Sequence, residues 1–249
     1  MKRVKLVVAY DGTNYCGWQV QKNGETIESV LNRAIGELTG EEIHVMGSSR
    51  TDAGVHACGN VAVFDTEARM AADKFSYALN QRLPEDIRIQ DSCEVPADFH
   101  PRFQKTVKTY EYRILNREFP LPAYRFNSHF TYRKLDVERM RQAAVYLIGE
   151  HDFQSFCAAG AQVKTTVRTI YALDVEKQGD LIILRITGNG FLYNMVRIIA
   201  GTLMKIGQGD WEPERIPEIL AGCDRQLAGP TAPARGLTLM EIHFKGEKG

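Results

Sequence analysis

The sequence predicts an α+β fold made of two ferredoxin-like (split βαβ) halves, each with the element order β-α-β-β-α-β. Three observations lead to this prediction. The length of 249 residues fits one large domain or two small ones. Segments with the two-residue period of strands alternate with segments that have the 3.6-residue period of amphipathic helices. The same order of such segments occurs twice along the chain.

The first half starts with a strand from Arg3 to Tyr10 and continues with a helix that Thr26 can cap and Gly40 can end. The apolar residues of this helix fall on one stripe, at Ile27, Val30, Leu31, Ala34, Ile35 and Leu38. Two strands, a helix that stops at Pro84 and a last strand should follow, at residues 43–48, 60–66, 72–82 and 86–94.

The second half repeats this order. A helix is expected from Asp136, as its cap, to Ile148, and a hairpin should turn across Gln178-Gly179-Asp180. The predicted strands cover residues 107–116, 126–132, 167–176, 181–187 and 237–244, and two further helices cover 191–206 and 213–221. The predicted domains are residues 1–100 and 101–249, whose sheets either meet edge to edge or pack face to face, with a cleft between the halves.

Composition narrows the class of protein. Hydrophobic residues make up 44 % and charged residues 25 %, as in ordinary soluble proteins. No apolar run of about 18 residues exists, and the chain enters a strand pattern at once, so we expect no signal peptide, no membrane span and a cytoplasmic protein. The five cysteines are scattered, which is typical of reduced thiols. His56 and Cys58 form the one close His/Cys pair, too few ligands to predict a metal site.

The charge of the whole chain is balanced, with 31 basic and 31 acidic residues, which by itself argues against a nucleic-acid partner. One stretch differs. Residues 100–117 carry an excess of +4, because Glu111 is the one acidic residue among Arg102, Lys105, Lys108, Arg113 and Arg117. This stretch is interpreted either as a phosphate-binding face or as a solvated face of a strand.

The segment from residue 47 to residue 58 holds the most informative position, Asp52. It joins two strand-like runs and contains small residues at 47–49 and 53–54, with Arg50 close to the carboxylate. Small residues allow a ligand or another backbone to come near, and loops held by a sheet often carry the chemistry. Alternatively, Asp52 is part of a simple turn and binds its own backbone.

The residues S-R-T-D-A-G-V-H-A at 49–57 resemble the catalytic loop of the bacterial tRNA pseudouridine synthases that modify positions 38, 39 and 40 of the anticodon stem-loop. Ser49 and Pro101 depart from the usual Gly and Ala of that family. Six more blocks extend the resemblance from end to end: Y-D-G-T-N-Y at 10–15 with G-W-Q at 17–19, F-H-P-R-F at 99–103, K-T-Y-E-Y at 108–112, G-E-H-D-F at 149–153, F-L-Y-N-M-V-R at 191–197 and A-P-A-R-G-L at 232–237.

The resemblance implies an isomerase that converts uridine to pseudouridine in tRNA without a cofactor or metal, works as a homodimer, and has one extended antiparallel sheet with a central cleft. Asp52 would be the catalytic nucleophile, or a base, with Arg50 keeping it ionised. Tyr110 would stack on the target uracil, whereas Tyr112, on the same strand face, belongs to the core.

Arg197 lies in an apolar helical stretch, where a guanidinium either reaches out to solvent or pairs with a buried carboxylate. Given the resemblance, it is expected to be a partner of Asp52 or of an RNA phosphate. Two other classes of protein remain as alternatives. A non-catalytic RNA-binding protein with two sheet platforms would be expected to carry the K/R-G-F/Y-G/A-F-V-x-F/Y signature, which the sequence lacks. A metal-dependent nuclease would need clustered carboxylates, which are also lacking.

Overall fold

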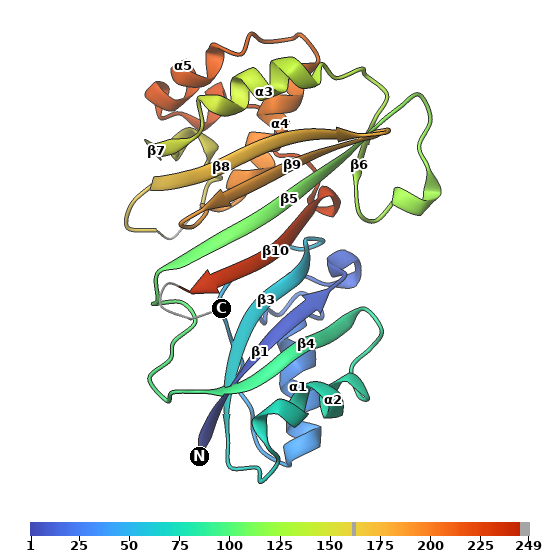
Figure 1. Ribbon diagram of the computed structural model, residues 1–249, viewed down its shortest axis with the longest axis vertical. Coiled ribbons are helices and arrows are strands. Elements are labelled where there is room, and N and C mark those ends of the chain that lie inside the picture. Colours follow the sequence, from blue (N-terminus) through green and yellow to red (C-terminus); the bar gives the residue numbers. More distant parts are fainter. Residues whose placement is uncertain (161–162, 245–249) are drawn as a thin grey trace. The chain divides into compact units, whose positions relative to one another are not determined.

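The computed structural model describes residues 1–160 and 163–244, and it confirms the predicted α+β class (Figure 1). The described residues divide into two compact units, one made of residues 1–105 and 239–244, the other of residues 106–160 and 163–238. None of the described helices is long and apolar enough to cross a membrane.

The first unit has the ferredoxin-like arrangement. Its strands follow the order β4-β1-β3-β10, with β2 also paired to β3, and β1 is antiparallel to both of its neighbours. Helices α1 and α2 lie on one side of these strands (Figure 1). The elements are β1 (Lys2–Tyr10), α1 (Ile27–Thr39), β2 (Met46–Gly47), β3 (His56–Thr66), α2 (Phe75–Asn80), β4 (Ile87–Val95) and β10 (Leu237–Phe244).

Local chemistry explains the bounds of these elements. Thr26 caps α1 through a reciprocal pair of hydrogen bonds with Ser29, and Gly40 ends it with a φ of 76°, as predicted. The predicted strand over 43–48 is much shorter, because the N–H of Val45 donates to the side chain of Asn32 on α1 at 2.8 Å. That N–H is therefore not available to a neighbouring strand.

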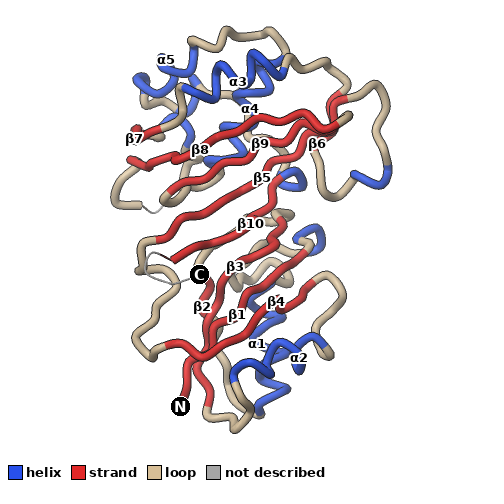
Figure 2. The backbone as a smooth tube through the Cα atoms, in the orientation of Figure 1, coloured by secondary structure: helices blue, strands red, loops and turns tan. Residues whose placement is uncertain are grey.

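The second unit has strands in the order β5-β9-β8-β7, with β6 parallel to β5. Figure 2 shows its helices gathered on one side of these strands. Asp136 caps α3 by accepting from two backbone N–H groups, as predicted. The elements are β5 (Thr106–Asn116), β6 (His129–Thr131), α3 (Val137–Val145), β7 (Gly149–Asp152), β8 (Val167–Gln178), β9 (Leu181–Gly188), α4 (Met195–Gly207) and α5 (Arg215–Gly222).

Two further details concern β7 and the last strand. Residues 149–152 form an extra strand, β7, on the edge of β8, where only the end of a helix was expected. The last strand, predicted at residues 237–244 and found there, is grouped from Leu239 onward with the first unit. A Cβ on Gly59 of β3 would lie 2.8 Å from the carbonyl oxygen of Met240, so β3 and β10 approach closely. The domain ranges 1–100 and 101–249 stay a prediction, because compactness does not test whether either range folds alone.

Candidate active site

The segment that carries Asp52 runs between β2 and β3 and contains a tight turn. The N–H of Val55 donates to the carbonyl oxygen of Asp52 at 3.1 Å, and Gly54 has a φ of +76°. A positive φ at the third of four residues is the property of a type II turn that calls for glycine. The simpler interpretation, a turn over residues 51–54 closed by the Asp52 side chain, is therefore replaced by a turn over residues 52–55 that a backbone hydrogen bond closes.

The first part of this loop is held by the buried side chain of Asn60 on β3. Its carbonyl oxygen accepts from the N–H of Ser49 at 3.3 Å, and its amide nitrogen donates to the carbonyl oxygen of Ser49 at 3.0 Å. One side chain thus satisfies both backbone groups of Ser49, much as a neighbouring strand would. Asn60 is 0 % exposed, so no water can replace these bonds.

The hydrogen-bond network continues to the residue next to Asp52. The amide of Asn60 also donates to the hydroxyl of Tyr10 at 3.3 Å, and that hydroxyl shares a 2.7 Å hydrogen bond with the Thr51 hydroxyl. All three side chains are buried. A fully buried polar chain of this kind is costly to disturb and therefore defines the position of the loop.

A second loop, after β1, packs directly beneath the first. The N–H of Trp18 donates to the carbonyl oxygen of Thr51 at 3.0 Å. Gly17 has a φ of +85°, and a Cβ there would lie 2.6 Å from that same oxygen, so only glycine allows this approach. Trp18 itself is fully buried and packs on Tyr10, with ring centroids 5.9 Å apart. The loop after β1 therefore supports the backbone of the Asp52 loop rigidly.

His56, at the start of β3, connects the end of the Asp52 loop to the loop after β1. Its Nδ1 lies 3.0 Å from a carboxylate oxygen of Asp11 and 3.2 Å from the N–H of Gly12. Burial opposes ionisation of Asp11, but hydrogen bonds from Thr13 and the interaction with His56 outweigh it, so the pKa of Asp11 is below its usual range. No cluster of three potential metal ligands occurs in the residues that the structure describes.

Asp52 and Arg50 are accessible, whereas their neighbours in the first part of the loop are buried. Asp52 is half-buried and Arg50 exposed, whereas Ser48, Ser49 and Thr51 are buried. This contrast presents one carboxylate and one guanidinium to the solvent from a backbone that cannot easily shift. It is the arrangement that a reaction needing a precisely placed ionised group requires.

A further guanidinium, which the sequence analysis did not assign to the loop, belongs to Arg102. Its Nε donates to the carbonyl oxygen of Gly47 at 2.7 Å. The residue is exposed as a whole, but its guanidinium is partly desolvated, and this desolvation together with the positive charge of Arg50 lowers its pKa. Two cations therefore lie near each other beside the loop.

Some of the basic residues between positions 100 and 117 form ion pairs with acidic residues of the protein. Arg113 pairs with the buried Glu111 at 3.0 Å, and Arg117 lies 3.6 Å from Asp180. Arg185 on β9 pairs with the other oxygen of Glu111. Arg113 and Arg117 are therefore half-buried and held by acidic residues of the protein itself, and Lys105 is exposed.

Tyr110 and Tyr112 lie on β5 in the second unit and have different surroundings. Tyr112 is 0 % exposed and its hydroxyl donates to the carbonyl oxygen of Pro233 at 2.9 Å, which confirms its assignment to the core. Burial raises the pKa of its phenol, which therefore stays protonated. Tyr110 is 8 % exposed, and its ring meets that of Phe191 edge-on, with centroids 5.2 Å apart. Phe191 thus fixes the orientation of Tyr110.

Arg197 lies in the first turn of α4. The prediction that this helix starts at residue 191 is wrong by four residues, because Asn194 adopts a left-handed conformation with a φ of 61° and the helix begins at Met195. The side chain of Asn194 accepts from a terminal nitrogen of Arg197 at 2.7 Å, and the carbonyl oxygen of Ala232 accepts from its Nε at 2.8 Å. The guanidinium is half-buried and firmly oriented.

The comparison with protein families decides the assignment. The family model described as tRNA pseudouridine synthase matches residues 6–104 and 143–245. The chain belongs to this family. The predicted family is thereby confirmed, although the K-T-Y-E-Y block at 108–112 lies outside the two matched stretches. The first matched stretch contains Asp52 and Arg102 and the second contains Arg197, whereas Tyr110 lies between the two stretches.

Full-length relatives agree with the family assignment. Three bacterial proteins called tRNA pseudouridine synthase A, from Acetivibrio thermocellus, Ruminiclostridium cellulolyticum and Brevibacillus brevis, are 48, 49 and 51 % identical to this chain. Each alignment covers 98 % of this chain and 100 % of the relative. Members of the family are isomerases that act on tRNA.

Proposed function

We propose that this protein converts uridine to pseudouridine in tRNA, at positions 38, 39 and 40 of the anticodon stem-loop. The observation that carries the proposal is Asp52, an accessible carboxylate on a loop whose backbone is held by Asn60, Tyr10 and Thr51. The family to which the chain belongs supports the reaction type.

The reaction exchanges one bond for another in the nucleotide. The bond between C1′ and N1 breaks, the base turns, and a bond between C1′ and C5 forms, while C5 loses a proton to solvent and N1 gains one. Nothing is oxidised and no group comes from outside, so the proposal includes neither cofactor nor metal. What the reaction needs is an ionised carboxylate near C1′ or C6, and an aspartate supplies it at neutral pH.

The other residues have supporting roles in this proposal. Arg50 provides positive charge that keeps Asp52 ionised and orients it. Tyr110, fixed by Phe191, holds the target uracil against its ring. Arg197, fixed by Asn194 and Ala232, supplies a second positive charge, either to Asp52 or to an RNA phosphate. We further propose a homodimer, as the family resemblance implies, and a cytoplasmic location, where its tRNA substrate is found.

Release of tritium from C5 of uridine tests the function directly. Incubating the purified protein with tRNA labelled at C5, with no metal or cofactor added, should release tritium to water in a time-dependent manner. A non-catalytic RNA-binding protein would bind the same tRNA and release none. Substrates that keep uridine at one of the three positions at a time would show which of positions 38, 39 and 40 are modified.

Replacing Lys105 and Lys108 by Ala should weaken binding to all tRNAs and flatten its dependence on salt. Each lost phosphate contact should reduce the slope of log K against log salt by about one. The measurement is tRNA affinity between low and moderate salt, with Lys177→Ala on the exposed end of β8 as control. An unchanged slope would show that these lysines face solvent and that RNA binds elsewhere.

Replacing Arg197 by Met should shift the activity–pH curve to higher pH, by about one to three units if the charge acts on Asp52. The sign follows from the chemistry, because removing a positive charge raises the pKa of a carboxylate that must be ionised to react. Arg197→Lys, which keeps the charge, is the control and should keep the wild-type curve. If Arg197→Met has normal activity and an unaltered curve, the predicted pairing of Arg197 with Asp52 is wrong.

A further inference from the structure

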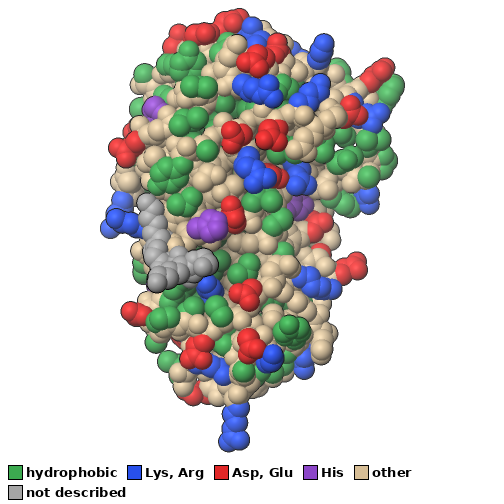
Figure 3. Space-filling model, viewed as in Figure 1, with side chains coloured by type: hydrophobic (Ala, Val, Ile, Leu, Met, Phe, Trp, Pro, Cys, Tyr) green, Lys and Arg blue, Asp and Glu red, His purple; other side chains and the backbone are tan. Residues whose placement is uncertain are grey.

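The connection between β5 and β6 exposes an unusual set of aromatic rings. Phe119 is 66 % exposed, Phe126 is 45 % exposed, and Tyr132, just after β6, is 74 % exposed. Figure 3 shows hydrophobic side chains gathered on the lobe that this connection forms. Single exposed aromatic residues are ordinary, but several within one connection indicate a binding surface. The segment lies outside both stretches matched by the family model.

Positive charge accompanies these rings. The guanidinium carbon of Arg125 lies 4.1 Å from the centre of the Phe126 ring, a cation–π arrangement. Arg117 and Arg133 pair with Asp180 and Asp210. Within residues 1–160 and 163–244, neither Arg125 nor Lys134 has an ion pair. Glu118 in the same connection is an exposed acidic residue, so Arg125 and Lys134 leave the surface an excess of one positive charge.

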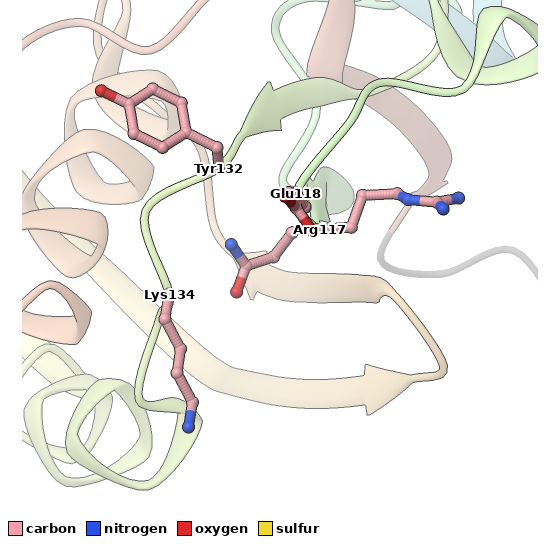
Figure 4. A pocket seen from close by; sticks show the side chains of 5 residues that line it. Arg117, Glu118, Tyr132 and Lys134 are labelled. Atoms are coloured by element: carbon pink, nitrogen blue, oxygen red, sulfur yellow. The ribbon is translucent and has the colours of Figure 1, made fainter.

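A hollow of about 330 Å³ lies at the base of this lobe (Figure 4). Tyr132 and Lys134 lie on one stretch of chain and Arg117 directly follows β5, and the three side chains point in different directions (Figure 4). The full lining is Asn116, Arg117, Glu118, Tyr132 and Lys134. The hollow thus combines an exposed ring and cations, groups with which proteins hold single nucleotides, and Glu118 adds one carboxylate to its lining.

The side chain of Asn116 makes this surface rigid. Its amide nitrogen donates to the carbonyl oxygens of Thr131 and Arg133, at 3.0 and 2.8 Å, and its oxygen accepts from the N–H of Leu135 at 3.0 Å. These bonds bracket Tyr132 on both sides. The ring is therefore presented from a fixed backbone, which lowers the entropy cost of binding.

We propose that this aromatic and basic surface binds an unpaired nucleotide of the tRNA other than the target uridine. The base stacks on Tyr132, and Lys134 and Arg125 meet neighbouring phosphates. Tyr110 and Asn116 are six residues apart on β5, or about 20 Å. That distance is too long for one nucleotide to contact both Tyr110 and the hollow. The proposal rests on the proposed tRNA substrate.

Affinity for a tRNA transcript that carries uridine at positions 38, 39 and 40 tests the surface. The measurement uses the full chain with Asp52→Asn, so that the RNA stays unmodified. Adding Tyr132→Ala should weaken binding by roughly fivefold or more, whereas Tyr132→Phe should keep the wild-type affinity, because stacking needs the ring and not the hydroxyl. In the active enzyme, Tyr132→Ala should raise KM and leave kcat unchanged.

Tyr77→Ala is the matched control. Tyr77 is 70 % exposed and has Lys74 5.6 Å from its ring, but it lies on α2 and does not line this hollow, so its loss should not change RNA affinity. Lys134→Ala should reduce the salt slope by about one.

Equal affinities of the Tyr132→Ala and parent proteins for tRNA would overturn the proposal. So would a Tyr132→Ala protein that loses self-association in sedimentation while keeping its RNA affinity, since the surface would then join two copies of the chain. The proposed function can fail separately. If the wild-type protein releases no tritium but Tyr132→Ala weakens tRNA binding fivefold, the proposed reaction is wrong and the proposed RNA-binding surface still stands.

Discussion

Replacing Asp52 by Asn should lower turnover by roughly four to six powers of ten, as removal of an essential nucleophile does in other enzymes. The substitution keeps the shape of the side chain and removes its negative charge. An amide neither attacks C1′ or C6 nor accepts a proton at neutral pH. The hydrogen bond from Val55 to the backbone of residue 52 and the bonds of Asn60 do not involve the Asp52 carboxylate, so the loop should keep its conformation.

Two measurements on the same preparation check this prediction, tritium release from C5 and affinity for tRNA. The affinity for tRNA should stay near that of the wild type, because replacing the Asp52 carboxylate by an amide removes no positive charge that could contact a phosphate. Asp91→Asn on the exposed face of β4 is the control and should retain normal turnover. A variant with Asn at position 52 that keeps even a tenth of wild-type activity would refute the catalytic role.

Replacing Asn60 by Leu should lower the free energy of unfolding by about 2 to 4 kcal/mol. Leucine fills a similar volume but leaves the N–H and C=O of the buried Ser49 without their side-chain partners, and it also removes a donor to Tyr10. The loop should shift as a result. Since a displacement of about 1 Å can reduce a rate a hundredfold, we expect kcat to fall by about that factor in the fraction that stays folded.

Urea unfolding gives the stability, and kcat is measured at saturating tRNA well below the unfolding midpoint. Tyr10→Phe removes one hydroxyl from the same network and should show a smaller effect in the same direction. Asn23→Leu in an exposed loop is the matched control, with no expected change in either quantity. Wild-type stability together with wild-type kcat in Asn60→Leu would mean that the network does not position the loop.

Local patterns in the sequence are enough to predict most of the elements. The stripe of apolar residues and the Thr26 cap define α1, and the alternation after Leu181 defines β9, because each signal lies in residues next to one another in the chain. Departures occur where distant groups compete for the backbone. Val45 is such a case, because it donates to Asn32 and not to a strand. The later start of α4 is of another kind, since it coincides with the left-handed conformation of Asn194 itself.

In the candidate site, too, local sequence predicts some features and contacts between distant residues decide others. The S-R-T-D-A-G-V-H-A block and its companions are enough to identify the family and to single out Asp52, since they are contiguous strings of residues. Asn60 gave one weak signal, a polar residue within an otherwise apolar strand segment, and the bond from Arg102 to Gly47 gave none.

The sequence by itself therefore determined the α+β class, the order of the elements, the family and the position of the carboxylate. Only the tertiary structure decided what holds that carboxylate in place and where the last strand belongs. The reason is physical. Periodicity and turn chemistry depend on neighbours in the chain, whereas the bonds from Asn60 to Tyr10 and from Arg102 to Gly47 join residues 50 and 55 positions apart, which come into contact only when the first unit has folded.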